Sequence, residues 1–435
     1  MTDILFGIFG LIVLLGIAFL FSNNKKSIKW QQIGIGIGLQ LLFAVFVILT
    51  PWGSMFFDAI GQFFVKIISF TNEGAKFVFG ALAIQGDFEK AFSPENKNLG
   101  FIFAFQVLPT IIFFSSLMTV LYHLGIMQKI VQGMAWVMAK AMKVSGAESI
   151  SVAANVFIGQ TEAPLVVRPY VEGMTKSELL TLMIGGMATI AGGVLAAYVG
   201  LLGGTDPQLQ LYYAKHLLSA SIMAAPATMV IAKILIPERE ESLTMGKVKV
   251  AIEKSNSNVI EAAATGAADG LKLALNVAGM LLAFIALIAM INWILEGVFT
   301  DLFGLSINGD PITLELLLGY LLSPIAWIIG VPWQDAINVG SLIGQKVVLN
   351  EFIAYLNLSQ LIPTGVLSPK AIIVSTYALC GFANFSSIAI QIGGIGGIAP
   401  TRRADLAKFG LKAVLGGTLA TFMTATIAGV LTSFQ

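Results

Sequence analysis

Apolar segments of about 20 residues recur along this chain and are separated by shorter polar segments. A helix needs about 20 predominantly apolar residues to cross a bilayer. Segments of this kind cover residues 4–21, 33–50, 101–122, 179–204, 217–237, 273–295, 371–399 and 409–432. They carry very few charges, and Lys233 lies near the end of 217–237. The pattern predicts eight transmembrane helices.

Two further segments are too polar for ordinary crossings. The basic loops on either side of residues 148–176 belong to the same face of the membrane, so this segment must enter and leave by that face. The same reasoning makes residues 337–369 a second re-entrant hairpin, entering from the opposite face. Both hairpins contain the fragment Ile-Gly-Gln, at 158–160 and 343–345, and each precedes two spans. This arrangement predicts an inverted repeat, as in many secondary transporters.

An amphipathic helix is expected over residues 54–80. One helical face carries Phe56, Phe57, Ile60, Phe63, Phe64, Ile67 and Ile68, and the opposite face carries Asp58, Gln62 and Lys66. Such a helix can lie on the membrane surface or pack between subunits, and the sequence leaves both open. Residues 316–333, broken by Pro324 and Pro332, are also expected along the interface.

The composition supports an all-α polytopic membrane protein. Only 11% of the 435 residues are charged, whereas soluble proteins have about 25%. The net charge of +1 provides no field to attract nucleic acid, so nucleic-acid binding is excluded. The first apolar segment has no basic residue before it and no cleavage site after it, so we expect it to be retained as a span.

Basic residues predict the orientation, because Lys and Arg are enriched in cytoplasmic loops. They cluster after the first, third and fifth spans and before the eighth: Lys25, Lys26, Lys29, Lys129, Lys140, Lys143, Arg239, Lys247, Lys249, Arg402 and Arg403. The segment between Lys272 and Lys346 has none. Both termini are therefore expected on the extracellular or periplasmic side.

Helix breakers mark a candidate site within the membrane. Gly159 and Pro164 interrupt the first hairpin, Gly192-Gly193 interrupts the fourth span, and residues 381–387 interrupt the seventh. Unwound backbone at membrane depth occurs where it is buried in protein or lines a cavity. We therefore expect a cavity where these breaks meet.

Glu162 and Glu351 are the most informative charges, because a carboxylate in an apolar segment is costly and usually functional. The alternative is structural pairing with Arg168 and Lys346. Gln160 and Thr161 lie beside the first glutamate and Asn350 beside the second. Such a set can bind a polar, uncharged molecule through several hydrogen bonds.

The interruption of the seventh span adds Asn384 and Ser387, three residues apart, and Phe382, which can stack on a flat ring. The alternative for Asn384 and Ser387 is helix packing. Asn155, Thr189 and the carbonyls near Ile158 and Ile190 supply neutral oxygens suited to Na⁺. The alternative for these groups is capping of broken helices.

Several other chemistries are excluded. With one cysteine, Cys380, and two histidines, His123 and His216, the chain cannot assemble a Cys/His metal cluster. It has no glycine-rich phosphate loop, and no basic cluster faces the candidate site, so phosphorylated substrates are disfavoured.

Four motifs carry a resemblance to a known family. They read NVFIGQTEAP at 155–164, TIAGGV at 189–194, NEFIAY at 350–355 and GFANFSS at 381–387. In this order, and in a chain of this length, they resemble the concentrative nucleoside transporter family, in its bacterial form. The resemblance covers nearly the whole chain.

This resemblance implies a homotrimer in the bacterial inner membrane and an elevator-type movement. Residues 1–122, with spans one to three and the helix at 54–80, and residues 256–300, with span six, would form the scaffold. Residues 123–255, with an interfacial helix, hairpin 148–176 and spans four and five, would form half of the transport domain. Residues 301–435, with an interfacial helix, hairpin 337–369 and spans seven and eight, would form the rest.

The resemblance also implies roles for particular residues. The nucleobase would contact Gln160, Thr161 and Glu162, beside Gly159, and the ribose would contact Glu351, Asn384 and Ser387. Phe382 and Val194 would line the site. The Na⁺ ligands would be Asn155, Ile158, Thr189 and Ile190. Thr189 replaces a familiar serine but keeps the hydroxyl.

The expected function is import of uridine-like nucleosides, coupled to Na⁺. A proton-coupled symporter, with Glu162 as the titrating group, is the alternative within the family. A channel is disfavoured because the polar residues of the hairpins are isolated and not regularly repeated. A membrane-embedded enzyme acting through Glu162 and Glu351 is disfavoured because no nucleophile-base pair or metal-ligand group is present.

Overall fold

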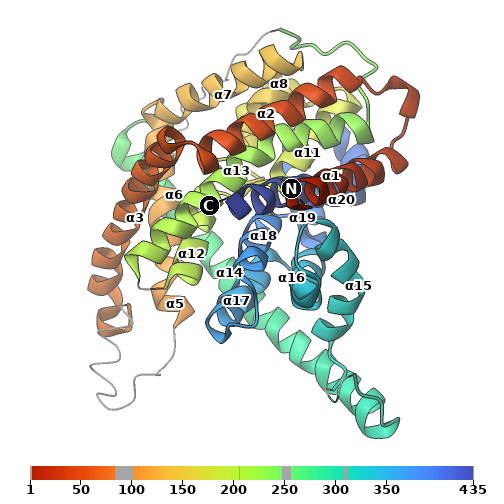
Figure 1. Ribbon diagram of the computed structural model, residues 1–435. Coiled ribbons are helices and arrows are strands. Elements are labelled where there is room, and N and C mark those ends of the chain that lie inside the picture. The colour runs from red at the N-terminus through yellow and green to blue at the C-terminus, as the bar shows by residue number, and fades with distance from the viewer. Residues whose placement is uncertain are drawn as a thin grey trace.

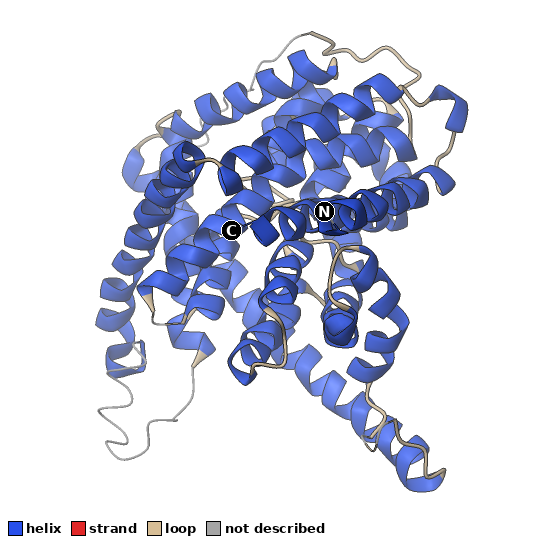
Figure 2. Cartoon of the chain, viewed as in Figure 1, coloured by secondary structure: helices blue, strands red, loops and turns tan. Residues whose placement is uncertain are grey.

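The computed structural model describes residues 2–83, 102–204, 206–246, 256–307, 309 and 311–434. Phe101, Lys247 and Lys249, which entered the predictions above, lie outside these ranges. Within them the regular elements are helices, and the β-structure is a single bridge between Ser145 and Met245 (Figure 2). The predicted all-α class is confirmed.

In chain order the helices are taken in three groups, and most of them are labelled in Figure 1. The first comprises α1 (Thr2–Leu20), α2 (Trp30–Leu49), α3 (Pro51–Phe79), α5 (Phe103–Gln106), α6 (Leu108–His123) and α7 (Ile126–Met142). The second comprises α8 (Gly146–Asn155), α9 (Ala163–Val166), α10 (Arg168–Val171), α11 (Lys176–Ala188), α12 (Gly192–Gly203) and α13 (Pro207–Leu235). The third comprises α14 (Val259–Leu295), a π-helical segment (Glu296–Leu302), α15 (Leu314–Ile328), α16 (Ala336–Val348), α17 (Glu351–Leu361), α18 (Pro369–Leu379), α19 (Phe385–Ile398) and α20 (Arg403–Leu431).

Eight helical stretches of the described chain are long and apolar enough to cross a membrane: Asp3–Leu20, Trp30–Leu49, Pro51–Ala83, Phe103–His123, Lys176–Gly203, Pro207–Leu235, Val259–Leu302 and Pro400–Phe434. Two differ from the prediction. The stretch with α3 qualifies although we expected an amphipathic helix and not a span there, and 371–399 does not qualify because its break divides it into the short helices α18 and α19.

The core consists of the helices that follow the first hairpin and the last helix. In the most apolar windows of the α11–α12, α13 and α20 stretches, 83%, 89% and 78% of residues are buried, against 22% for those of α1, α3 and α14.

The peripheral pair α6 and α14 packs through glycine. A Cβ on Gly270 would lie 2.7 Å from the Ile112 Cα, and one on Gly266 would lie 2.7 Å from the Ser116 Cα. Small residues allow this close approach between membrane helices.

Both hairpins are present, with shifted boundaries. The first consists of α8, an irregular turn at 156–162, and the short helices α9 and α10. It begins at Gly146, because Ser145 and Glu148 form a capping box that starts α8 two residues earlier than expected. The second consists of α16 and α17, and the Asn350 side chain caps α17 by accepting from the Ile353 N–H at 3.0 Å.

The two broken spans differ from expectation in the position of the break. Residues 189–191 separate α11 from α12, so Gly192 and Gly193 begin α12 and do not lie within the break. The Gly192 N–H, which has no partner in its own helix, donates to the Phe157 carbonyl at 3.0 Å. Residues 380–384 separate α18 from α19, and 385–387 form the first turn of α19.

Lys233, the charge noted within the fifth span, is buried and paired. Its Nζ lies 2.6 Å from a Glu148 carboxylate oxygen and 3.6 Å from one of Glu238. It also donates to the Ser177 hydroxyl at 2.9 Å. A buried charge is tolerated when it is paired and hydrogen-bonded, so this cluster ties the start of α8 and α11 to the end of α13.

Candidate functional site

A continuous chain of hydrogen bonds joins both hairpins to both broken spans. Its members lie on the turn of the first hairpin, on α12, at the start of α17, and at the start and middle of α19: Gln391, Gln160, Ser387, Asn384, Glu351 and Tyr198. All six are buried. Four of them were singled out in the sequence, and the fold brings these four together.

The first hairpin meets α19 through two glutamines. Gln160 Nε2 donates to the Ser387 hydroxyl at 3.1 Å. The other end of the same amide, Gln160 Oε1, accepts from Gln391 Nε2 at 3.1 Å. Gln391 Nε2 also donates to the Met183 carbonyl of α11 at 2.9 Å. Gln160 is therefore held at both ends of its amide.

The second hairpin meets the seventh span through Glu351 and Asn384. Asn384 Nδ2 donates to Glu351 Oε2 at 2.9 Å, and the Tyr198 hydroxyl donates to Glu351 Oε1 at 3.1 Å. The Asn384 oxygen caps α19 by accepting from the Ser387 N–H at 2.9 Å. Because Glu351 is the first residue of α17, the helix dipole also favours its negative charge.

The glutamates differ in their surroundings. Glu351 accepts hydrogen bonds from the neutral groups of Tyr198 and Asn384, while Lys346 Nζ donates to the Ala378 carbonyl at 2.8 Å and the Thr421 hydroxyl at 3.2 Å. Glu162 is exposed. Its carboxylate lies against Gly159, where a Cβ would come within 2.3 Å of Oε2.

The remaining predicted substrate residues flank this chain of hydrogen bonds. Thr161 packs on Gly394 of α19, where a Cβ would lie 3.3 Å from the threonine methyl group. Val194 is buried in the first turn of α12, and Phe382 is half-buried in the break before α19. The predicted site residues thus include an exposed carboxylate, that of Glu162, and a buried one, that of Glu351.

A set of neutral oxygens lies where the first hairpin meets the break between α11 and α12. Asn155 Nδ2 donates to the Ser151 carbonyl at 2.9 Å, but its Oδ1 is buried and has no hydrogen-bond partner. The Thr189 hydroxyl donates to the Gly185 carbonyl at 2.8 Å, which leaves its lone pairs available. A Cβ on Gly185 would lie 3.3 Å from Asn155 Nδ2, so α8 and α11 are in contact beside this break.

These donors fit an alkali cation better than a transition metal. A buried polar oxygen without a partner costs about 1–3 kcal/mol, and a bound cation would remove that cost. The described residues contain no group of three or more His, Cys, Asp or Glu side chains that could hold a metal. Amide, hydroxyl and carbonyl oxygens at unwound helices are the ligands that transporters use for Na⁺. Ile158 and Ile190 would contribute carbonyls.

Tyr198 and Gln391 were missed by the sequence reasoning. Gln391 is an amide within the apolar helix α19, and Tyr198 lies in the apolar helix α12. A polar group in an apolar membrane segment was the signal used for the two glutamates, and it applied to these residues as well. The sequence did not show their hydrogen-bond partners, because these lie on other segments of the chain.

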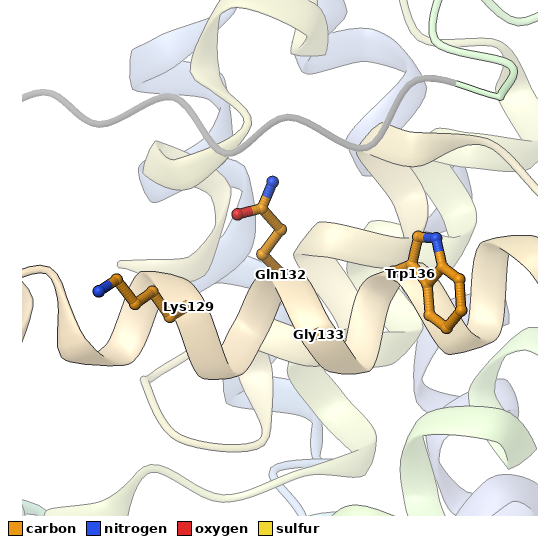
Figure 3. A pocket seen from close by; sticks show the side chains of 4 residues that line it. All are labelled: Lys129, Gln132, Gly133 and Trp136. Carbon is orange, nitrogen blue, oxygen red and sulfur yellow. The ribbon is translucent and has the colours of Figure 1, made fainter.

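Two surface hollows in the described part of the chain lie away from this site. One, of about 360 Å³, lies along α7 and is lined by Lys129, Gln132, Gly133 and Trp136 (Figure 3). A second, of about 410 Å³, lies near the start of α11 and the end of α13. None of the predicted site residues lines either hollow.

Gly186 of α11 supplies a test of the glutamine pair. A Cβ there would lie 2.8 Å from Gln391 Nε2 and 2.9 Å from the Gln160 Cβ, so Gly186→Ala must displace one of them. We expect this overpacking to lower the affinity for the bound solute by about 5- to 10-fold. The measurement is the solute concentration that gives half-maximal uptake into proteoliposomes. Gly200→Ala in α12 is the control, because its Cβ meets nothing within 4 Å, and equal losses in both variants would contradict the assignment.

Three family models match the chain. They are described as Na⁺ dependent nucleoside transporter N-terminus, matching residues 9–82, nucleoside recognition (Gate), matching 104–205, and Na⁺ dependent nucleoside transporter C-terminus, matching 216–429. Together they extend over most of the chain.

Relatives that match nearly the whole of this chain are also transporters. The chain is 46% identical to the uncharacterized transporter YutK of Bacillus subtilis over 98% of this chain and 99% of that protein. It is 40% identical to solute carrier family 28 member 3 of Mus musculus over 97% of this chain, and 39% identical to sodium/nucleoside cotransporter 1 of the same species over 97%. It spans 58% and 63% of the length of these two mammalian proteins.

Solved structures share the fold. CNTnw in an inward-facing substrate-bound state superposes with a TM-score of 0.90 at 43% identity, covering 100% of this chain and 99% of that one. A substituted form of CNTnw in an outward-facing state superposes with a TM-score of 0.91 at 42% identity and the same coverage.

Proposed function

Because this chain belongs to the concentrative nucleoside transporter family, we propose that it imports nucleosides in symport with Na⁺ across the bacterial inner membrane. Members of this family are transporters, so the alternative of a membrane-embedded enzyme is excluded. The observation that carries the proposal is the buried hydrogen-bond chain that joins both hairpins to both broken spans.

The substrate would occupy the region bounded by this chain and its flanking residues. A nucleoside has hydroxyl groups on the ribose and donors and acceptors on the base edge. Glu351, Asn384 and Ser387 would bind the ribose, because a buried carboxylate is a strong acceptor for hydroxyl groups. The base would contact Gln160, Thr161 and Glu162 beside Gly159, with Phe382 and Val194 as its apolar neighbours.

Na⁺ would bind between the first hairpin and the break of the fourth span. The unsatisfied Asn155 Oδ1 supports this position, together with the Thr189 hydroxyl and the carbonyls of Ile158 and Ile190. One inward charge across about 100 mV provides about 2.3 kcal/mol, and a tenfold Na⁺ gradient adds about 1.4 kcal/mol. Together these sustain a nucleoside gradient of roughly five-hundredfold.

Movement of a transport domain against a scaffold would provide alternating access. The predicted scaffold helices α6 and α14 pack tightly on each other, which supports a rigid partner for the movement. The predicted transport helix α12 packs on α6, where a Cβ on Gly193 would lie 3.5 Å from the Ile111 carbonyl oxygen. An inward-facing and an outward-facing structure of CNTnw support an alternating-access mechanism for the family.

We also propose a homotrimer in the lipid bilayer, with both termini on the periplasmic or extracellular side. Large apolar side chains are exposed on the scaffold helices, including Phe77 on α3 at 92% and Trp293 on α14 at 75%. Lipid or a neighbouring subunit must cover such residues. Asp58 of α3 pairs within the same chain, since its carboxylate lies 3.0 Å from Lys215 Nζ of α13.

The deciding experiment is uridine uptake into proteoliposomes with an inward Na⁺ gradient or an inward proton gradient at matched membrane potential. We expect saturable uptake with Na⁺ alone. Uptake driven by protons alone would transfer the coupling role to Glu162, the alternative within the family. Absence of uptake under either gradient would contradict the nucleoside assignment, and uptake that does not saturate would favour a channel.

A further inference from the structure

Gln391 is a buried amide within an apolar part of α19, and it lies outside the proposed contacts to base, ribose and Na⁺. Only 1% of its surface is exposed, and its neighbours on α19 are isoleucine, alanine and glycine residues. Burying an amide costs free energy unless it is hydrogen-bonded. Gln391 Nε2 makes both of its hydrogen bonds, to the Met183 carbonyl at 2.9 Å and to Gln160 Oε1 at 3.1 Å.

The Met183 carbonyl determines how the Gln391 amide is oriented. A backbone carbonyl oxygen can only accept, so the NH₂ end of Gln391 must face it. The Gln391 Oε1 is buried and has no hydrogen-bond partner, so the amide is held by its donor end alone. A reversed amide would place two oxygens against each other at Met183.

The orientation of Gln391 in turn determines that of Gln160. Because the shared NH₂ group of Gln391 donates to Gln160, the Gln160 amide must present its oxygen to Gln391. Its own NH₂ group then points away, with one hydrogen donated to the Ser387 hydroxyl and one remaining for a solute. Rotation of the amide by 180° would exchange this donor for an acceptor.

The two glutamine side chains are tightly packed against α11. A Cβ on Gly186 of α11 would lie 2.8 Å from Gln391 Nε2 and 2.9 Å from the Gln160 Cβ. The two glutamines come from segments 231 residues apart in the chain. Their contact is therefore a built feature of the interface between the first hairpin, α11 and α19.

We propose that Gln391 is a positioning residue that fixes the Gln160 amide with its donor toward the nucleobase, and so sets discrimination between bases that carry a carbonyl or an amino group. This inference rests on the proposed function, in which Gln160 contacts the base. Gln391 makes no hydrogen bond to the ribose-binding residues Glu351, Asn384 and Ser387. It reaches Ser387 only through Gln160, so its main effect is on the base.

The test compares three solutes on the full-length protein in proteoliposomes at saturating Na⁺. Uridine and cytidine differ in the carbonyl or amino group of the base, and 3′-deoxyuridine differs from uridine only in the ribose. Gln391→Leu removes the amide, and Gln391→Met does so with a side chain closer in shape to glutamine. Gln345→Leu is the matched control, because Gln345 is a buried glutamine whose hydrogen bonds go to Ser341 and Asn357.

In both Gln391 variants we expect the ratio of uridine to cytidine affinity to change by about three- to tenfold, the equivalent of one neutral hydrogen bond. The ratio of uridine to 3′-deoxyuridine affinity changes much less, because Gln391 reaches the ribose-binding Ser387 only through Gln160. The control changes neither ratio. Equal losses for all three solutes, or unchanged ratios, would overturn the role of Gln391 while leaving the proposed function standing. A wild-type protein that transports neither uridine nor cytidine would overturn both.

Discussion

Replacing Glu351 by glutamine should weaken nucleoside binding by about 10- to 100-fold. Hydrogen bonds to a charged acceptor contribute about 1.5–3 kcal/mol and neutral ones about 0.5–1.5 kcal/mol. Glu351 makes hydrogen bonds to the ribose and to the protein, and each becomes weaker when the acceptor is neutral. A total loss of about 1.4–2.8 kcal/mol in binding free energy corresponds to the 10- to 100-fold loss of affinity. The effect is large because Glu351 is only 4% exposed, so water cannot take the place of its carboxylate.

The local geometry adds to this loss. Both oxygens of Glu351 accept, one from Tyr198 and one from Asn384. A glutamine has one acceptor oxygen, so its NH₂ group would face one of these two donors. The asparagine also caps α19, and its displacement would disturb Ser387 at the start of that helix. Ribose recognition would therefore lose more than one contact.

Uridine binding to the purified protein, measured calorimetrically at saturating Na⁺, gives the affinity directly. Glu172→Gln is the matched control, because Glu172 is an exposed glutamate just after α10 and accepts from the Thr401 hydroxyl. Its affinity for uridine should equal that of the wild type. If Glu351→Gln also bound uridine with unchanged affinity, the placement of the ribose beside Glu351 would be wrong.

Replacing Asn155 by leucine should abolish concentrative uptake. Without Na⁺ coupling the accumulation ratio falls from roughly five-hundredfold toward about one, since a neutral nucleoside alone gains nothing from the membrane potential. Leucine keeps the branched shape of asparagine but has no oxygen for the ion. It would also remove the hydrogen bond from Asn155 Nδ2 to the Ser151 carbonyl, so protein yield and thermal stability are recorded alongside.

The measurement is the ratio of internal to external uridine at steady state, with an inward Na⁺ gradient. Asn357→Leu, which removes an asparagine of α17 bonded to Gln345, is the control and should accumulate uridine as the wild type does. Persistent Na⁺-dependent accumulation in Asn155→Leu, with the same half-saturating Na⁺ concentration, would show that the ion binds elsewhere. Proton-driven accumulation in the wild type would instead favour proton coupling with Glu162 as the titrating group.

Local pattern was sufficient for the fold class and for most elements. Apolar length, polar hairpins and helix breakers are properties of neighbouring residues, so they predicted the re-entrant segments and the breaks within a few residues. Errors arose where capping decided a boundary. Gly192 and Gly193 begin α12 because a free helical N–H donates to Phe157, and Ser145 with Glu148 starts α8 early.

The sequence by itself determined that this is an all-α membrane protein of the nucleoside transporter family, and it singled out Gln160, Glu351, Asn384 and Ser387. Their role in binding stays a prediction, but their assembly into one hydrogen-bond chain was decided by tertiary structure alone. The cost of a polar group in an apolar segment can be read from the segment itself. The partner that offsets this cost cannot, because Gln391 finds Gln160, and Tyr198 finds Glu351, only when distant helices pack.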